Sequence, residues 1–117
     1  MVNAAGSELP FLSPVEALDA SAVRQLQQSR LRTQVAHLWA HSPFYQRKFR
    51  AAGLKPDALR TIDDLQRVPF TTKQELRDSL RAAPPFGEHL AVPVADVVQM
   101  QASSGTTGSP SYVALTA

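Results

Sequence analysis

The sequence contains no cysteine. Disulfide-stapled folds and thiolate metal sites are therefore excluded, and the composition fits a reducing compartment. The first twenty residues contain no lysine or arginine and no long apolar run. We therefore expect neither a secretory signal nor a membrane span, and we expect a cytoplasmic location. Charge is also missing from residues 101–117, which is unusual for a solvated chain end.

Metal ligands are scarce as well. His37 and His41 stand four residues apart, but the glutamate of an H-E-x-x-H zinc motif is missing between them. We interpret these two residues and His89 as surface or helix-end histidines, and we expect no metal site.

Basic residues are concentrated between positions 24 and 60, where eight lysines and arginines stand against a single acidic residue, Asp57. A basic stretch can mark a nucleic-acid face, or it can be a solvated helix surface whose long side chains cover apolar neighbours. Because no known nucleic-acid motif accompanies the charge, the second interpretation is favoured and no nucleic-acid partner is expected.

Proline and hydroxyl residues predict where helices begin and end. Ser13–Glu16 has the pattern of a capping box and predicts a brief helix, after residues 1–12 that we expect to be loosely ordered. Apolar residues with helical spacing, including Leu31, Val35 and Leu38, predict a longer helix over 21–41. Ser42-Pro43 ends that helix and begins another, which Gly53 terminates.

The second half of the chain predicts shorter elements. Thr61 begins a helical turn, and Thr72–Glu75 is a clear capping box for a helix that continues to about Leu80. The segment Pro84–Gly87 breaks that helix. Residues 97–102 and 111–116 alternate like strands, so the chain is predicted to be mostly α-helical with a C-terminal β-hairpin.

The turn of this hairpin is rich in groups that bind phosphate. It contains glycines that allow close backbone approach, hydroxyl donors, and consecutive N–H groups that can form an anion-binding nest. A Walker-type loop is excluded because no lysine follows either glycine, and a dinucleotide fingerprint is excluded by the glycine spacing. A plain flexible linker remains an alternative. The residues concerned are Ser103, Ser104, Gly105, Thr106, Thr107, Gly108, Ser109 and Pro110.

The order strand, Ser-Ser-Gly-Thr-Thr-Gly-x-Pro, strand resembles the phosphate-binding loop of the adenylate-forming acyl-CoA synthetase superfamily. Blocks upstream of the loop narrow this resemblance to the phenylacetate-CoA ligase family, from about Arg24 to the last residue. The blocks are Ser42–Tyr45 with Phe49, Phe70–Arg77, Phe86-Gly87, Val92-Pro93 and Met100–Gly108.

The resemblance implies an α/β fold for the full-length family, of which residues 13–117 are the truncated N-terminal part of the large AMP-binding domain. It also implies a two-step reaction. The carboxylate of an aryl acid such as phenylacetate attacks ATP to give an acyl-adenylate and pyrophosphate, and coenzyme A then displaces AMP to give a thioester. In this family the loop holds the β- and γ-phosphates while Mg²⁺ bridges oxygens, so Ser103, Ser104, Thr106 and Thr107 are the expected donors. Gly105 and Gly108 supply the backbone geometry.

Two departures from the family pattern affect this interpretation. Ser109 stands where family members usually carry lysine, and the later motifs, including the magnesium-binding acid and the catalytic lysine, lie beyond Ala117. We therefore assign no catalytic residue to this chain and expect no turnover from it alone, and a homodimer of the full-length protein is compatible with the resemblance. The alternative is a non-catalytic interaction or regulatory module that retains the loop.

Overall fold

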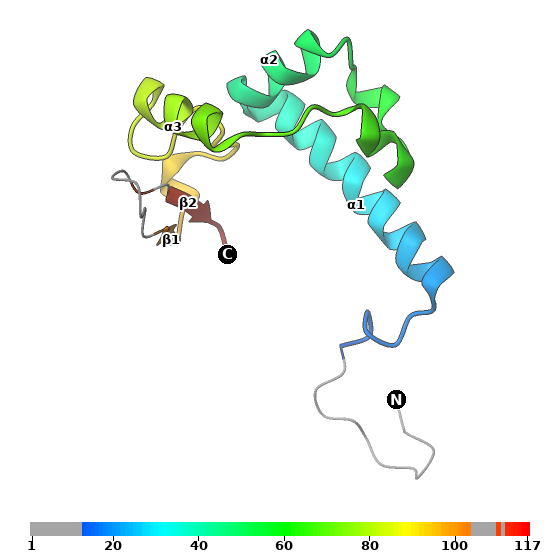
Figure 1. Cartoon of the computed structure of the whole chain (residues 1–117). Coiled ribbons are helices and arrows are strands. Elements are labelled where there is room, and N and C mark those ends of the chain that lie inside the picture. The colour runs from blue at the N-terminus through cyan, green and yellow to red at the C-terminus, as the bar shows by residue number, and fades with distance from the viewer. Residues whose placement is uncertain (1–12, 104–109, 111) are drawn as a thin grey trace.

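The computed structural model describes residues 13–103, 110 and 112–117, and the predicted looseness of residues 1–12 lies outside the described residues. A helical region leads into a hairpin of two strands (Figure 1). The helices are α1 (Ala20–His41), α2 (Pro43–Ala51) and α3 (Lys73–Ala82), with short 3-10 turns η1 (Pro56–Ala58), η2 (Ile62–Arg67) and η3 (Val94–Asp96). The strands are β1 (Gln99–Ala102) and β2 (Tyr112–Leu115).

The start of α1 differs from the sequence prediction. Asp19 caps the helix, and its side chain accepts a hydrogen bond from the backbone N–H of Ala22 at 2.8 Å. The predicted brief helix at Ser13 is wrong, because residues 14–17 form only a turn. The Glu16 carboxylate accepts from the Ser13 N–H, while the Glu16 N–H donates to the backbone carbonyl of Ser13 and not to its hydroxyl. One hydrogen-bonded turn without continuation does not recover the entropy of nucleating a helix.

The break between α1 and α2 follows the prediction. Ser42 caps α2, with its side chain accepting from the N–H of Tyr45, and Pro43 occupies the first helical position. At the other end Gly53 adopts a positive φ of 66°, and the N–H of Leu54 donates to the carbonyl of Phe49. This is a Schellman-type ending, which brings the apolar residue after the glycine back onto the helix.

The apolar core lies between α1, α2 and η1. Val35, Phe49, Leu54 and Leu59 are each less than 5% exposed, so they are fully removed from water. Partly buried neighbours complete the core; they are Leu31, Leu38, Trp39, Tyr45, Ala52 and Val68. The predicted apolar stripe of α1 therefore supplies one wall of the core.

Helix α3 is the second element that the sequence locates well. Thr72 and Glu75 exchange backbone-to-side-chain hydrogen bonds and form the predicted capping box. After α3 the chain turns at residues 84–87 and reaches the hairpin, which lies beside α3 and away from the N-terminal part of α1 (Figure 1). Among the described residues from Thr72 onward, only Ser79 and Gly87 are buried.

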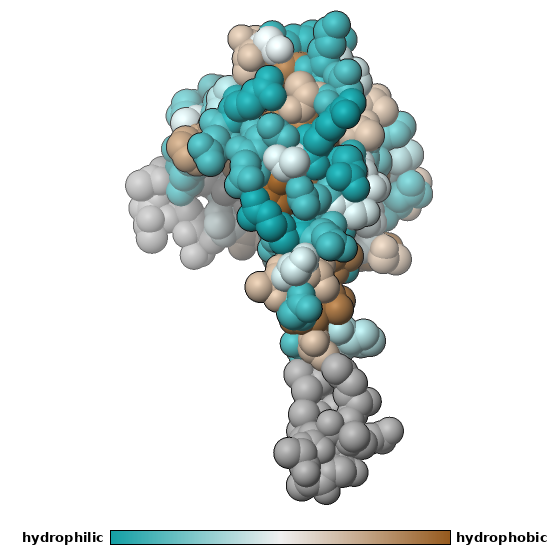
Figure 2. Space-filling model, turned by 90° about the vertical axis from the view of Figure 1, so that its right-hand side faces the viewer, coloured by the Kyte–Doolittle hydropathy of each residue, from teal (hydrophilic) through white to brown (hydrophobic). Residues whose placement is uncertain are grey.

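The hydrophilic surface of the helical region is visible in Figure 2, where polar residues cover most of the face that is shown. The apolar core is therefore screened from solvent on this side. Apolar side chains are exposed instead before α1, at Val15 and Leu18, and on the hairpin, at Val98, Met100, Val113 and Leu115.

Candidate functional site

The hairpin holds the two ends of the predicted phosphate-binding loop next to each other. Strands β1 and β2 are antiparallel, and their last pair joins Ala102 to Tyr112. Residues 103–111 therefore connect two positions that face each other across the sheet. The backbone N–H of Val98 extends the pairing by donating to the carbonyl of Leu115 at 2.9 Å.

The predicted site residues are only partly described. Ser103 follows β1 directly and is exposed. Ser104, Gly105, Thr106, Thr107 and Gly108 lie outside the described residues, as does Ser109. Their role as phosphate donors stays a prediction, and the structure describes what surrounds the ends of the loop.

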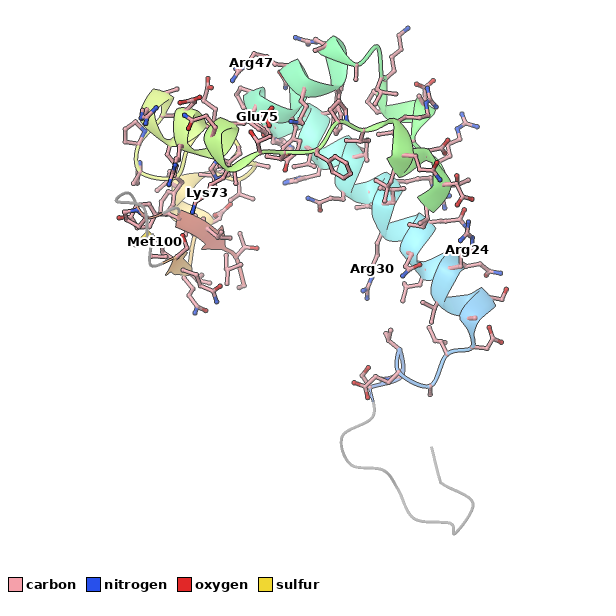
Figure 3. The ribbon with its side chains drawn as sticks, viewed as in Figure 1. Arg24, Arg30, Arg47, Lys73, Glu75 and Met100 are labelled. Carbon is pink, nitrogen blue, oxygen red and sulfur yellow. The ribbon has the colours of Figure 1, made fainter. Side chains whose placement is uncertain are left out.

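Helix α3 lies against the hairpin close to the ends of the loop. A pocket of about 420 Å³ is formed between them, with Met100 and Tyr112 contributed by the strands. In Figure 3 Met100 lies on the hairpin and Lys73 at the start of α3. The other lining residues are Arg77, Leu80, Arg81, Pro84, Pro85 and Pro110. The pocket therefore combines two guanidinium groups with apolar walls, and one guanidinium, that of Arg81, forms an ion pair with Asp78 at 2.7 Å.

A histidine joins α3 to the segment that follows it. The Nδ1 atom of His89 lies 2.9 Å from the hydroxyl of Ser79, and the backbone N–H of His89 donates to the same oxygen at 3.1 Å. Burial lowers the pKa of His89, and a hydrogen bond with the backbone of Tyr112 opposes this shift. His89 is half-buried and lies outside every helix, so its interpretation as a surface or helix-end residue is wrong.

Polar contacts join α2 to α3 and to the segment after α3. The Lys48 ammonium lies 2.7 Å from the Glu75 carboxylate, and Figure 3 shows Glu75 at the junction of the two helices. This hydrogen bond, supported by those from Thr72, lowers the pKa of Glu75 from 4.5 to about 2. Arg47 forms a second ion pair, with Glu88.

The same junction forms one wall of a pocket of about 600 Å³ between α2 and α3. Its charged lining residues are both of these ion pairs and a third carboxylate, that of Asp78, whose partner Arg81 is not part of the lining. The lining therefore carries three carboxylates against two cations.

Much of the basic stretch is engaged within the chain. Arg24 pairs with Asp63 of η2, and Arg50 lies over the Trp39 ring at 5.4 Å. Arg32 and Arg60 donate to backbone carbonyls of the η1–η2 segment. Figure 3 shows Arg24 and Arg30 extending from α1 in different directions. These cations are thus distributed over the surface of the helical region, and the Arg50 side chain covers the ring of Trp39.

The rings of His37 and His41 lie 4.8 Å apart on α1. Within the described ranges, no group of three or more histidine or acidic side chains is arranged to hold a metal ion. The helices that the structure describes are too short or too polar to cross a membrane.

Sequence reasoning did not find the contacts between distant segments. Ser79 and His89 are ten residues apart, and Lys48 and Glu75 are twenty-seven apart, so no helical or strand periodicity links them. One pattern in the sequence could have indicated such contacts: a charged or polar residue at an otherwise apolar position. When such a residue is buried, it needs a partner.

This chain is similar to curated ligases. It is 44% identical over 105 residues to the phenylacetate-coenzyme A ligase of Escherichia coli, and 42% identical over 106 residues to that of Pseudomonas putida. It is 43% identical over 102 residues to that of Thermus thermophilus. The matches cover 87–91% of this chain and 22–23% of each relative, so the chain spans about a quarter of the relatives' length. A scan of protein-family models found no match.

Solved structures agree with the sequence comparison. A 2-hydroxyisobutyryl-CoA ligase in complex with 2-HIB-AMP and CoA in the thioesterification state is 31% identical and superposes with a TM-score of 0.76. An open conformation of the same kind of ligase is 28% identical, with a TM-score of 0.75. Both cover 94% of this chain, and this chain covers 25% and 27% of theirs. The helical lead-in and the hairpin are therefore part of the fold of such ligases.

Proposed function

We propose that this chain, which is similar to phenylacetate-CoA ligases over about nine-tenths of its length, is the N-terminal part of an AMP-forming acid–CoA ligase that activates an aryl carboxylic acid such as phenylacetate. The observation that carries this proposal is the identity of 42–44% to curated phenylacetate-CoA ligases over about nine-tenths of the chain. The substrates are then the acid, ATP and coenzyme A. The solved ligases above, with their acyl-AMP and CoA ligands, support the same reaction class.

In this proposal the loop at 103–108 binds the triphosphate of ATP. The facing strand ends at Ala102 and Tyr112 support this role, because they bring the two ends of the loop together on a paired hairpin. Hydroxyl and N–H donors form charge-assisted bonds with phosphate oxygens, each worth about 1.5–3 kcal/mol. The donors are Ser103, Ser104, Thr106 and Thr107, with Gly105 and Gly108 allowing close approach.

Magnesium fits this arrangement as a partner of the phosphate oxygens. Mg²⁺ in nucleotide sites commonly has one or two protein carboxylates and keeps the substrate phosphates and water as its other ligands. We assign no magnesium ligand to this chain.

The test is pyrophosphate release by the complete polypeptide that carries this chain, with phenylacetate, benzoate and medium-chain acids offered in turn. We expect release that depends on both ATP and an aryl acid. A double variant, Gly105→Val with Gly108→Val, should raise the KM for ATP strongly, because added side chains keep the backbone away from the phosphates. Release that is absent with every acid, or a double variant with unchanged KM, contradicts the proposal.

Ser109 allows a gain-of-function arm of the same experiment. A Ser109→Lys variant adds one charged donor, so the KM for ATP should fall by roughly tenfold, which corresponds to about 1.4 kcal/mol. Ser109→Ala is the matched control, and it should change the KM by less than the lysine does. If both variants changed the KM for ATP equally, Ser109 would not lie in the nucleotide site.

A second function is favoured by the serine at position 109. Without the usual lysine, the loop can be a retained feature of a non-catalytic interaction or regulatory module. Calorimetric titration of the complete polypeptide with ATP separates the two functions. Heat of binding that the glycine double variant abolishes supports the ligase, and an absence of binding by the unmodified protein supports the module.

A further inference from the structure

His89 lies where α3, the segment after it and strand β2 meet. The hydroxyl of Ser79, on the buried side of α3, contacts both the His89 ring and its backbone N–H, at 2.9 and 3.1 Å. Ser79 is only 3% exposed, so these bonds form out of contact with bulk water. Hydrogen bonds of this kind fix a side chain firmly, because breaking them leaves a buried polar atom without a partner.

The imidazole also reaches the hairpin. His89 and Tyr112 line the same pocket of about 510 Å³ beside β2, and a hydrogen-bond contribution from the Tyr112 backbone opposes the lowering of the pKa of the imidazole. Tyr112 is the first residue of β2 and pairs with Ala102, the last residue of β1. One side chain therefore connects α3 to the point at which the loop 103–111 enters the second strand.

Gly87 leaves the space that the imidazole occupies. Its φ of +83° favours glycine, and a Cβ added there would lie 2.6 Å from Nδ1 of His89 and 2.8 Å from the Ser79 hydroxyl. The edge of the Phe44 ring limits the imidazole elsewhere, with ring centres 6.3 Å apart at 79°. The His89 ring is thus confined by the backbone on one side and by an aromatic ring on another.

The protonation state suits a bridging role. Burial lowers the pKa of His89, which favours the neutral form of the imidazole. The Ser79 hydroxyl accepts from the His89 backbone N–H and has one proton left to donate to Nδ1. The other ring nitrogen then carries the ring proton and can donate it to a backbone carbonyl, so every donor in the network has an acceptor.

We propose that His89 is a positioning residue for the phosphate-binding loop, since its imidazole fixes Tyr112, and through it the facing strand ends, at a set place on α3. The role in ATP binding rests on the function proposed above. Nothing in this role requires His89 to touch the nucleotide. Loss of the imidazole leaves the helical core intact and loosens the hairpin, so it weakens the binding of ATP and leaves the binding of the acid unchanged.

The test uses three substitutions at one position in the complete polypeptide. His89→Ala removes both side-chain contacts, His89→Asn retains an amide near the place of Nδ1, and His89→Gln reaches about as far as the imidazole. We expect the KM for ATP to rise roughly tenfold in the alanine and asparagine variants and to recover in part in the glutamine variant. His41→Asn, on the exposed end of α1, is the matched control and should leave the KM unchanged.

Backbone hydrogen exchange of the same proteins gives a readout that does not depend on activity. In His89→Ala the amides of β1 and β2 should exchange at least several-fold faster, while those of α1 and α2 keep their protection. If the unmodified protein releases no pyrophosphate but His89→Ala still speeds hairpin exchange, the fixing of Tyr112 is supported and only the ligase function is overturned. Unchanged hairpin exchange, or a lower kcat with an unchanged KM for ATP, overturns the positioning role.

Discussion

The two halves of this structure are stabilised in different ways. In residues 20–68 the apolar side chains of α1, α2 and η1 form a closed core. From Thr72 onward the buried described residues are a serine and a glycine, and the contacts with α2 include ion pairs, hydrogen bonds and one ring contact, between His89 and Phe44. Because burial of apolar surface is the main driving force of folding, the first half has its own source of stability. The half that carries the candidate site depends on directional contacts, as ligand-binding segments commonly do.

The largest expected effect is the loss of a core side chain. Phe49→Ala should destabilise the chain by about 3–5 kcal/mol, because it removes a ring that is 3% exposed and leaves a cavity. Val113→Ala on the hairpin, where the side chain is 54% exposed, should cost less than about 1 kcal/mol. Urea unfolding followed by circular dichroism measures both. Equal losses would mean that the hairpin shares one core with the helices.

The two glycines with positive φ allow a finer comparison. In Gly53→Ala nothing lies within 4 Å of the new Cβ. The free energy of unfolding should therefore fall only by the strain of a left-handed backbone at alanine, about 1–2 kcal/mol. Gly87→Ala meets the same backbone strain and also collides with His89 and Ser79. We expect the larger effect of Gly87→Ala to be confined to the hairpin. Its amides should exchange faster, while the unfolding transition followed by Trp39 fluorescence should change little. If the free energy of unfolding from Trp39 fluorescence fell as much as the free energy of opening from hairpin exchange, the separation of the two halves would be contradicted.

Acid should loosen the junction before it affects the core. The pKa of Glu75 is about 2 in the folded chain against 4.5 ordinarily, so its carboxylate contributes stability above pH 4.5. That contribution is lost as the pH falls from about 4.5 to about 2. Glu75→Gln should therefore show a smaller decline of the urea midpoint across this range than the unmodified chain. Identical pH profiles would mean that the Lys48–Glu75 pair does not hold α2 to α3 in solution.

The smallest effect is expected from an ion pair in residues 20–68, the half that has its own apolar core. Arg24 and Asp63 are 51% and 69% exposed, so Asp63→Asn should change the free energy of unfolding by less than about 1 kcal/mol. The change should shrink further in 0.5 M salt, because screening weakens exposed pairs. A loss comparable to that of a core substitution would show that charge, and not apolar burial, holds η2 to α1.

Local signals in the sequence located most of the helices. The Thr72–Glu75 box, the Ser42-Pro43 break and Gly53 each specify a backbone geometry within a few residues, and each is confirmed. Ser13–Glu16 carries the same kind of signal but forms only a turn, since a cap needs a continuing helix. The strands are confirmed with ends shifted by one or two residues, and the predicted two-stranded hairpin is present.

Contacts between distant segments could not be predicted in this way. Two contacts depend on the packing of α3 against α2 and on the turn at Gly87. They are the hydrogen bond between His89 and Ser79 and the ion pair between Lys48 and Glu75. The same limit applies to the candidate site. The composition of residues 103–108 indicated phosphate chemistry, but the supports of its ends, His89 above all, come from other parts of the chain.

The position of the core in the chain has a consequence for biosynthesis. All side chains that close it come from residues 31–68, and none comes from α3 or the hairpin. Elements made first leave the ribosome first, and contacts that are close in sequence form quickly. The helical region can therefore fold while the strands are still being synthesised. The hairpin then forms after the core is complete, and it packs onto that region with its apolar side chains Met100, Val113 and Leu115 still exposed.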